Sequence, residues 1–233
     1  MSYACEFQAF IAKSPPEKRG DGFPHSGSRR RHNGLSNPTM RGFVKEWKKR
    51  HPSLSYEDWQ QTLDHLYHGP SIEEACLAGF LLETSPRLRQ QLPLPTLDRW
   101  INCLEGWREI DTTCQSTFSD SEYLARWEHW EPLLKDFAYR STISHRRASL
   151  VLLIKALRHT KDDRLLTLTL ININQLREEK DKLITKAISW ALRSAINQFG
   201  DEVSSYVHDH RDQLPSVAVR EFERKYSDVM RSS

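Results

Sequence analysis

Helix-start signals recur along the chain, and they constrain its fold more than any other feature. Ser, Thr and Asn residues that can accept a hydrogen bond from a helix N-terminus stand at short intervals, often with an acidic residue or a proline soon after. These signals are Asn37–Pro38, Ser55 with Asp58, Ser71 with Glu74, Ser85–Pro86, Thr96, and Ser119 with Glu122. Each precedes a stretch with the period of an amphipathic helix. The sequence therefore predicts a succession of helices with short connections.

β-Strand signals are correspondingly scarce. No Asn-Gly or Asp-Gly pair lies between alternating apolar residues, and the one run of β-branched residues, LTLTLININ, sits within a segment of helical period from about 162 to 177. Helices of about 10–20 residues with short connections favour antiparallel pairs, which recur roughly every 35–45 residues. We therefore predict an all-α fold, a superhelical solenoid of antiparallel helix pairs of the HEAT-like or ARM type.

The N-terminal region differs in composition from the rest of the chain. A short helix is followed by a segment dense in Pro, Gly, Ser and Arg, residues 14–36, which has no apolar period. We expect residues 1–36 to form this helix and a flexible arm, and residues 37–233 to form the helical-repeat domain. The run Arg29–Arg31 in the arm is either a solvated charge cluster or a contact to DNA phosphates.

Composition favours a globular, cytoplasmic protein. The chain has 233 residues, 38% of them hydrophobic and 28% charged, so it can bury a sizeable core. No apolar run approaches the roughly 18 residues of a membrane span, so we expect no membrane-spanning segment, and we expect no secretory signal at the N-terminus. The four cysteines show neither CxxC spacing nor a local HxxxH, so we expect buried, reduced thiols and no metal or redox cofactor. A net charge of +3 permits a nucleic-acid partner without arguing for one.

The segment DKLITKAISWALRSAINQF, near residues 180–199, carries the most informative helical pattern. Its apolar residues form one broad stripe, and Gly200 follows as the expected C-terminal cap. Trp190 falls on the opposite face, with Lys186 and Arg193 about one turn away on either side. Two interpretations of this tryptophan stay open. Another helix or a protein partner packs over it, or it lies on a nucleic-acid surface where the cations hold phosphates.

A second segment, TISHRRASLVLLIKALR over residues 142–158, is predicted to be one helix with a basic flank. Arg147, Lys155 and Arg158 are spaced at i, i+8 and i+11 and share a stripe beside the apolar one. Each of these side chains alone is typical of a solvated surface. Together they form the basic strip that phosphate binding needs, so we expect a concave basic face that binds DNA.

The third informative segment is EGWREID. It places Trp107 and Asp111 four residues apart, so an indole and a carboxylate share one face of a helix. Asp111 is either a surface carboxylate paired with an arginine or a catalytic group. Within a basic groove a carboxylate repels phosphate, so there it would serve to stabilise positive charge on a substrate or to orient a water molecule.

These three segments, in this order and spacing, resemble the bacterial DNA alkylation repair family, the AlkD-like DNA glycosylases built from HEAT-like repeats. The resemblance extends from about residue 34 to 226 and includes GLSNPTMRGFVKEW near its start and VAVREFERKY near its end. The region before GLSNP departs from the family, because it is rich in Pro and Gly where the family has a regular helix.

The resemblance implies a role for each candidate residue. Asp111 takes the place of the family's catalytic aspartate, and Trp107 and Trp190 take the places of its two active-site tryptophans. Arg147 and Arg193 take the places of DNA-contacting arginines of the family, and Lys155 that of a basic groove position. We expect these three to bind DNA together with Lys186 and Arg158, which helical spacing places beside them.

The resemblance also implies an activity. The family excises cationic N3- and N7-alkylated purines, so this chain is expected to act in base excision repair as a monomeric, monofunctional glycosylase that leaves an abasic site. Its partner would be alkylated duplex DNA in the bacterial cytoplasm, in the nucleoid when bound. Two alternatives stay open: a specialist for bulky alkyl adducts, and a non-catalytic HEAT-like module that binds DNA or protein.

Overall fold

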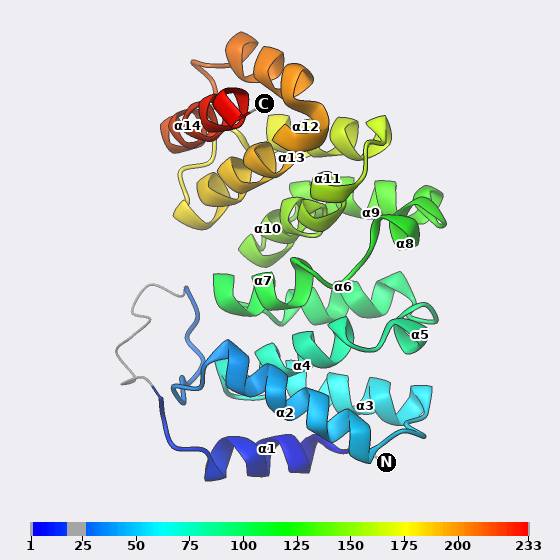
Figure 1. The fold of residues 1–233 in the computed structure, drawn as a ribbon. Coiled ribbons are helices and arrows are strands. Elements are labelled where there is room, and N and C mark those ends of the chain that lie inside the picture. The colour runs from blue at the N-terminus through cyan, green and yellow to red at the C-terminus, as the bar shows by residue number, and fades with distance from the viewer. Residues whose placement is uncertain (1, 18–26, 233) are drawn as a thin grey trace. The chain divides into compact units, whose positions relative to one another are not determined.

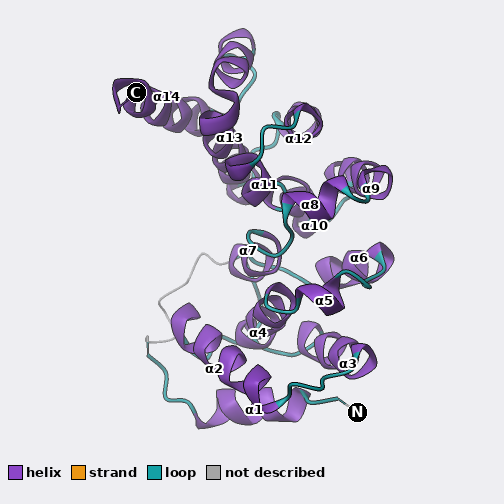
Figure 2. Cartoon of the chain, turned by 45° about the vertical axis from the view of Figure 1, so that its right-hand side comes forward, coloured by secondary structure: helices purple, strands orange, loops and turns teal. Residues whose placement is uncertain are grey.

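The fold is all-helical throughout the residues that the computed structural model describes, 2–17 and 27–232. Figure 2 shows helices and loops only, and a single isolated bridge joins Arg31 to Ser71. The all-α prediction is confirmed. The chain divides into two compact units, Met1–Thr117 and Phe118–Ser233. Among the described residues, no helix combines the length and the apolarity needed to cross a bilayer.

Unit 1 stacks its helices in pairs (Figure 1). Its helices are α1 (Ala4–Lys13), α2 (Asn37–Arg50), α3 (Tyr56–Tyr67), α4 (Ile72–Glu83), α5 (Pro86–Arg89), α6 (Leu94–Asn102) and α7 (Trp107–Cys114). The rings of Phe7 and Phe10 pack on Phe43, and Phe7 also packs on Trp47 together with Tyr3, so α1 and α2 run antiparallel. Helix α4 contacts both α2 and α7. Antiparallel packing is therefore present within this unit, although residues 14–36, and not a short connection, join α1 to α2.

Local capping explains where several of these helices begin. Ser71 and Glu74 form a complete capping box at α4, and Ser119 and Glu122 form another at the first helix of unit 2. At α2 the prediction was one residue late, because the hydroxyl of Ser36, which precedes Asn37, accepts the backbone N–H of Thr39. Helix α6 likewise starts two residues before Thr96, at Leu94.

Helix α4 is the centre of unit 1, and a glycine lets α7 approach it closely. Every residue from Ile72 to Leu82 is buried. A Cβ atom added to Gly79 would lie 2.9 Å from the backbone carbon of Thr112 and 3.0 Å from the nitrogen of Thr113. These contacts are with helix backbone, which moves only if α7 shifts as a whole.

Gly79→Ala is therefore expected to destabilise unit 1 and displace α7. Overpacking of this kind costs about 1–3 kcal/mol of unfolding free energy, although alanine is the better helix former. Denaturant unfolding measures the change. Gly42→Ala in α2 is the matched control, because a Cβ there meets no heavy atom within 4 Å, and it should leave stability unchanged or raised. Equal stabilisation by both substitutions would contradict the close approach.

Unit 2 contains the remaining helices. They are α8 (Asp120–Leu124), α9 (Trp127–Tyr139), α10 (Ile143–Val151), α11 (Ile154–His159), α12 (Asp163–Leu176), α13 (Lys182–Asp209) and α14 (Ser216–Ser232). Helices α10 and α11 both pack on α13, which also packs on α14. The run LTLTLININ lies within α12, as its helical period predicted.

The segment predicted as one helix over 142–158 is two helices, α10 and α11. The buried Asn172 of α12 donates its side-chain amide to the carbonyl oxygen of Ser149 at 3.1 Å. Beside that contact, the backbone N–H of Leu153 donates to the carbonyl oxygen of Leu150, three residues back, and not to that of Ser149. The carbonyl oxygen of Leu152 accepts the hydroxyl of Tyr123 at 2.6 Å. Side-chain donors from other helices thus interrupt the local hydrogen-bond ladder.

The helix end predicted at Gly200 corresponds to a break one residue earlier. Helix α13 consists of two helical stretches joined across Phe199, whose φ of −138° and ψ of 37° are not helical, and the second stretch continues to Asp209. The apolar stripe predicted for residues 180–199 is confirmed, since its members are 3% exposed or less. They are Ile184, Ala187, Ile188, Ala191, Leu192, Ala195, Ile196 and Phe199.

Part of the predicted flexible arm, residues 18–26, lies outside the described residues. The part that follows is attached to unit 1. The backbone N–H of Arg31 donates to the carbonyl oxygen of Pro70 at 3.1 Å, and its carbonyl oxygen accepts the N–H of Ile72 at 3.0 Å. This stretch therefore runs beside the start of α4.

Candidate functional site

In unit 1 the candidate residues stand on α7. Trp107 is its first residue and Asp111 lies one turn later, and both are partly exposed. The residues between them, Arg108, Glu109 and Ile110, are buried. Helix α7 therefore keeps an indole and a carboxylate accessible while the residues between them hold it to the unit.

Arg108 anchors α7 to the end of the arm. Its Nη2 donates to the carbonyl oxygen of Leu35 at 2.5 Å and to Oδ1 of Asn37 at 3.0 Å. Its Nη1 lies 2.9 Å from Nε2 of His32. With a side chain only 4% exposed, this guanidinium ties the helix that carries Trp107 to residues far away in sequence.

Glu73 of α4 balances that buried charge. Its side chain is fully buried, and Nη1 of Arg108 lies 3.9 Å from its Oε1. The carboxylate accepts the backbone N–H groups of Asn33 and Gly34, each at 3.0 Å. Arg108 and Glu73 together clamp the arm between α4 and α7, and the clamp fixes the N-terminal end of α7.

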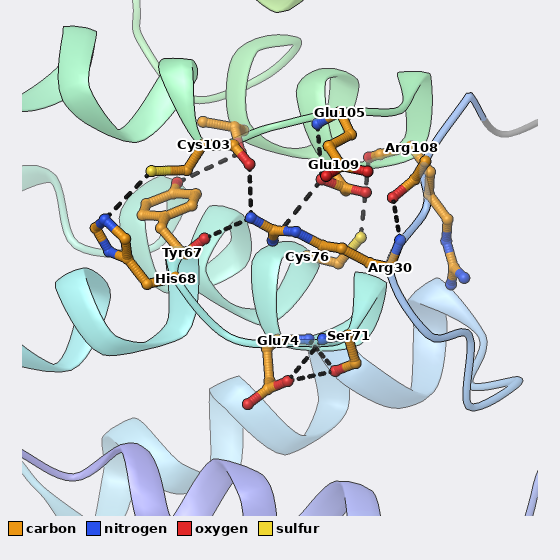
Figure 3. Close-up of polar contacts among 12 residues, drawn as sticks. Arg30, Tyr67, His68, Ser71, Glu74, Cys76, Cys103, Glu105, Arg108 and Glu109 are labelled. Carbon is orange, nitrogen blue, oxygen red and sulfur yellow. Dashed lines mark hydrogen bonds and ion pairs between the residues drawn. The ribbon is translucent and has the colours of Figure 1, made fainter.

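Arg30 reinforces this attachment from the other side (Figure 3). Its Nη2 donates to the carbonyl oxygens of Tyr67, at 2.7 Å, and Cys103, at 2.6 Å, which close the C-terminal ends of α3 and α6. Its Nη1 lies 3.8 Å from Oε2 of the buried Glu109, whose pKa is raised by burial. For Arg30, the expectation of a solvated cluster is therefore wrong.

In unit 2 an exposed cation lies over an indole. The guanidinium of Arg158, from α11, is 5.8 Å from the ring centroid of Trp190 on α13. Its Nε donates to Oγ of Ser194 at 3.2 Å. Burial, and then the charge of Arg193, lower the pKa of Arg158. Two guanidinium groups thus act on each other beside a partly exposed indole, and such a surface favours an anion.

The other cationic candidates in unit 2 differ in exposure. Arg147 is only 5% exposed, and its guanidinium donates to the carbonyl oxygen of Leu183 at the start of α13. Lys155 is partly exposed, while Lys186 and Arg158 are exposed. The strip predicted from spacing is therefore buried at its first member and reaches the surface toward Arg158.

The cysteines are all free thiols. Cys76 and Cys114 are buried, as expected. Cys5 is exposed and Cys103 partly exposed, so the expectation of burial is wrong for these two. Cys103 lies at the C-terminal end of α6, where its Sγ is 3.3 Å from Nε2 of His68.

The residues that hold α7 in place could not be predicted from the sequence. Arg108 and Glu109 stand within EGWREID, and their positions between Trp107 and Asp111 are the one local signal that they face inward. The partners Arg30 and Glu73 come from segments far away in sequence. Arg30 stood out only as a member of the run Arg29–Arg31, and nothing in the sequence distinguished Glu73.

Comparisons with known proteins agree with this architecture. The family model described as DNA alkylation repair enzyme matches residues 5–223. A solved structure, a predicted DNA alkylation repair enzyme from Enterococcus faecalis, has 18% sequence identity and a TM-score of 0.68, covering 94% of this chain and 92% of that one. The structure shares the fold. A search of curated proteins found no match. Because the family model spans nearly the whole sequence, the chain belongs to the DNA alkylation repair enzyme family.

Proposed function

We propose that this protein is a DNA glycosylase that hydrolyses the N-glycosidic bond of cationic N3- and N7-alkylated purines in duplex DNA. The chain belongs to the DNA alkylation repair enzyme family, and the observation that carries the proposal is the arrangement of two side chains on α7. There, Trp107 and Asp111 stay accessible on a helix that buried charges hold in place. A carboxylate held in this way is suited to stabilising a developing cation.

The substrate's own charge starts the reaction. An alkylated purine is already cationic, so its glycosidic bond breaks with the electron pair going to the base, which leaves as a neutral molecule. The sugar is left as an oxocarbenium ion. The carboxylate of Asp111 stabilises this cation and orients the water that attacks C1′, and it takes up the proton that the water loses. The products are a free base and an abasic site, which makes the enzyme monofunctional.

The aromatic and basic residues hold the DNA. The indole face of Trp107, one turn from Asp111, contacts the sugar and favours its positive charge, and the indole of Trp190 in unit 2 offers the DNA an aromatic surface of its own. The exposed or partly exposed cations Arg158, Arg193, Lys155 and Lys186 bind flanking phosphates. Arg147 supports this surface by holding the start of α13, where its guanidinium meets the carbonyl oxygen of Leu183.

The direct test is release of free bases from methylated duplex DNA by the purified protein. We expect 3-methyladenine or 7-methylguanine to appear on chromatography, and the release to continue after treatment with a chelator, because the bond is weakened by the charge of the base. Tight binding to duplex DNA without release would contradict this substrate range. Repeating the assay with bulky N-alkyl adducts would then separate a bulky-adduct glycosylase from a non-catalytic DNA-binding module.

A further inference from the structure

A carboxylate from α14 lies against one of the proposed phosphate-binding arginines. Oε2 of Glu221 is 3.4 Å from Nη2 of Arg193 on α13. Oγ of Ser189, one turn before Arg193, donates to the same carboxylate oxygen at 2.5 Å. Nε of Arg193 in turn donates to Oγ of Ser189 at 3.2 Å. The three side chains therefore form a closed ring of polar contacts.

This ring leaves Arg193 able to bind an anion. Ser189 is fully buried, whereas the side chain of Arg193 is 34% exposed and that of Glu221 is 28% exposed. Within the ring, Nε of Arg193 donates a hydrogen bond and Nη2 makes an ion pair. A guanidinium has five N–H donors. Nη1 and the remaining Nη2 proton stay available, in an orientation that the ring restricts.

Arg158 provides the contrast within the same unit. Among the described residues it has no ion-pair partner, and its guanidinium rests over Trp190 and on Ser194. Of these two neighbouring cations, Arg193 alone is oriented by a carboxylate from another helix. A long, flexible side chain that is oriented before binding loses less conformational entropy when a ligand arrives.

We propose that Glu221 is a positioning residue, which orients Arg193 for a phosphate of the DNA backbone. The inference rests on the proposed function only in assigning DNA to Arg193. Glu221 has two opposed effects on the binding of a phosphate. Its negative charge repels the phosphate, whereas its contact with Arg193 orients the guanidinium toward the phosphate and so favours binding. Because these effects have opposite signs, two substitutions can separate them.

The test compares Glu221→Ala with Glu221→Gln. Alanine removes both the charge and the contact, whereas the glutamine oxygen carries no charge but can still accept from Ser189, the hydroxyl to which Nε of Arg193 donates. Affinity for one undamaged duplex is measured by fluorescence anisotropy at one fixed salt concentration, because salt alone changes such affinities strongly. We expect Glu221→Ala to weaken binding by about threefold to tenfold. We expect Glu221→Gln to bind as well as the unaltered protein or more tightly.

A double-mutant cycle and a charge control separate positioning from a general structural effect. In an Arg193→Ala background, Glu221→Ala should cause no further loss, since nothing remains to be oriented. Glu223→Ala removes a carboxylate from the same helix, where Glu223 pairs with Arg211, and should not weaken binding. Thermal unfolding of each variant verifies that the fold is kept.

The proposal is overturned if Glu221→Ala binds DNA as tightly as the unaltered protein or more tightly. It is equally overturned if the loss is the same with and without Arg193, or if Arg193→Ala alone leaves the affinity unchanged. Failure of the proposed function would look different: no base would be released, while the coupling between Glu221 and Arg193 in DNA binding persisted.

Discussion

Asp111→Asn is expected to reduce base release from methylated DNA by at least about 10²–10³-fold, the cost of removing one electrostatic stabiliser of a transition state. Asparagine keeps the size and shape of the side chain but carries no charge to oppose the oxocarbenium ion and cannot take up the proton of the attacking water. Single-turnover release of free base measures the effect, because it isolates the chemical step from product release.

For DNA binding, we expect Asp111→Asn to have no adverse effect, in contrast to its effect on base release. Loss of a negative charge from a surface that binds phosphates should leave affinity for duplex DNA unchanged or raised. The control is Glu57→Gln, which neutralises an exposed carboxylate at the start of α3 and should change neither release nor affinity. Base release that persists in Asp111→Asn at the rate of the unaltered protein would show that another group carries the chemistry.

Arg108→Leu is expected to lower the free energy of unfolding by about 3–5 kcal/mol, the cost of removing one partner from a buried ion pair. The substitution leaves the carboxylate of Glu73 buried without its neighbouring guanidinium, and the carbonyl oxygen of Leu35 without that donor. Denaturant unfolding, followed by tryptophan fluorescence, measures the loss. Because Arg108 holds the start of α7, base release should fall even at temperatures where the variant stays folded.

Two further variants make this prediction specific. Arg164→Leu is the control, since that guanidinium pairs with Asp162 at an exposed position, where solvent screens the pair, and its loss is expected to change stability little. Glu73→Gln combined with Arg108→Leu removes both charges of the buried pair and should recover part of the lost stability. An Arg108→Leu protein as stable as the Arg164→Leu protein would rule out the clamp.

The all-α fold class and the starts of several helices could be predicted from the sequence, because they depend on residues that lie one helical turn apart. The capping boxes at Ser71 and Ser119 and the apolar stripe of α13 all follow from spacings of three or four residues. The pairing of Trp107 with Asp111 on one helical turn, and the place of Trp190 off the apolar stripe, follow from the same periodicity.

Tertiary contacts alone decided the rest, because they join groups that no local spacing relates. Asn172 of α12 donates to the carbonyl oxygen of Ser149 where α10 ends, although the sequence there continues with helical period. The cations could be located from the sequence, but their environments could not. Arg108 is buried, and Arg30 is largely covered, because carbonyl oxygens and carboxylates from other segments surround them. Arg193 meets Glu221 because α14 packs on α13. Burial of a charge requires partners, and the fold, rather than the neighbouring sequence, brings those partners together.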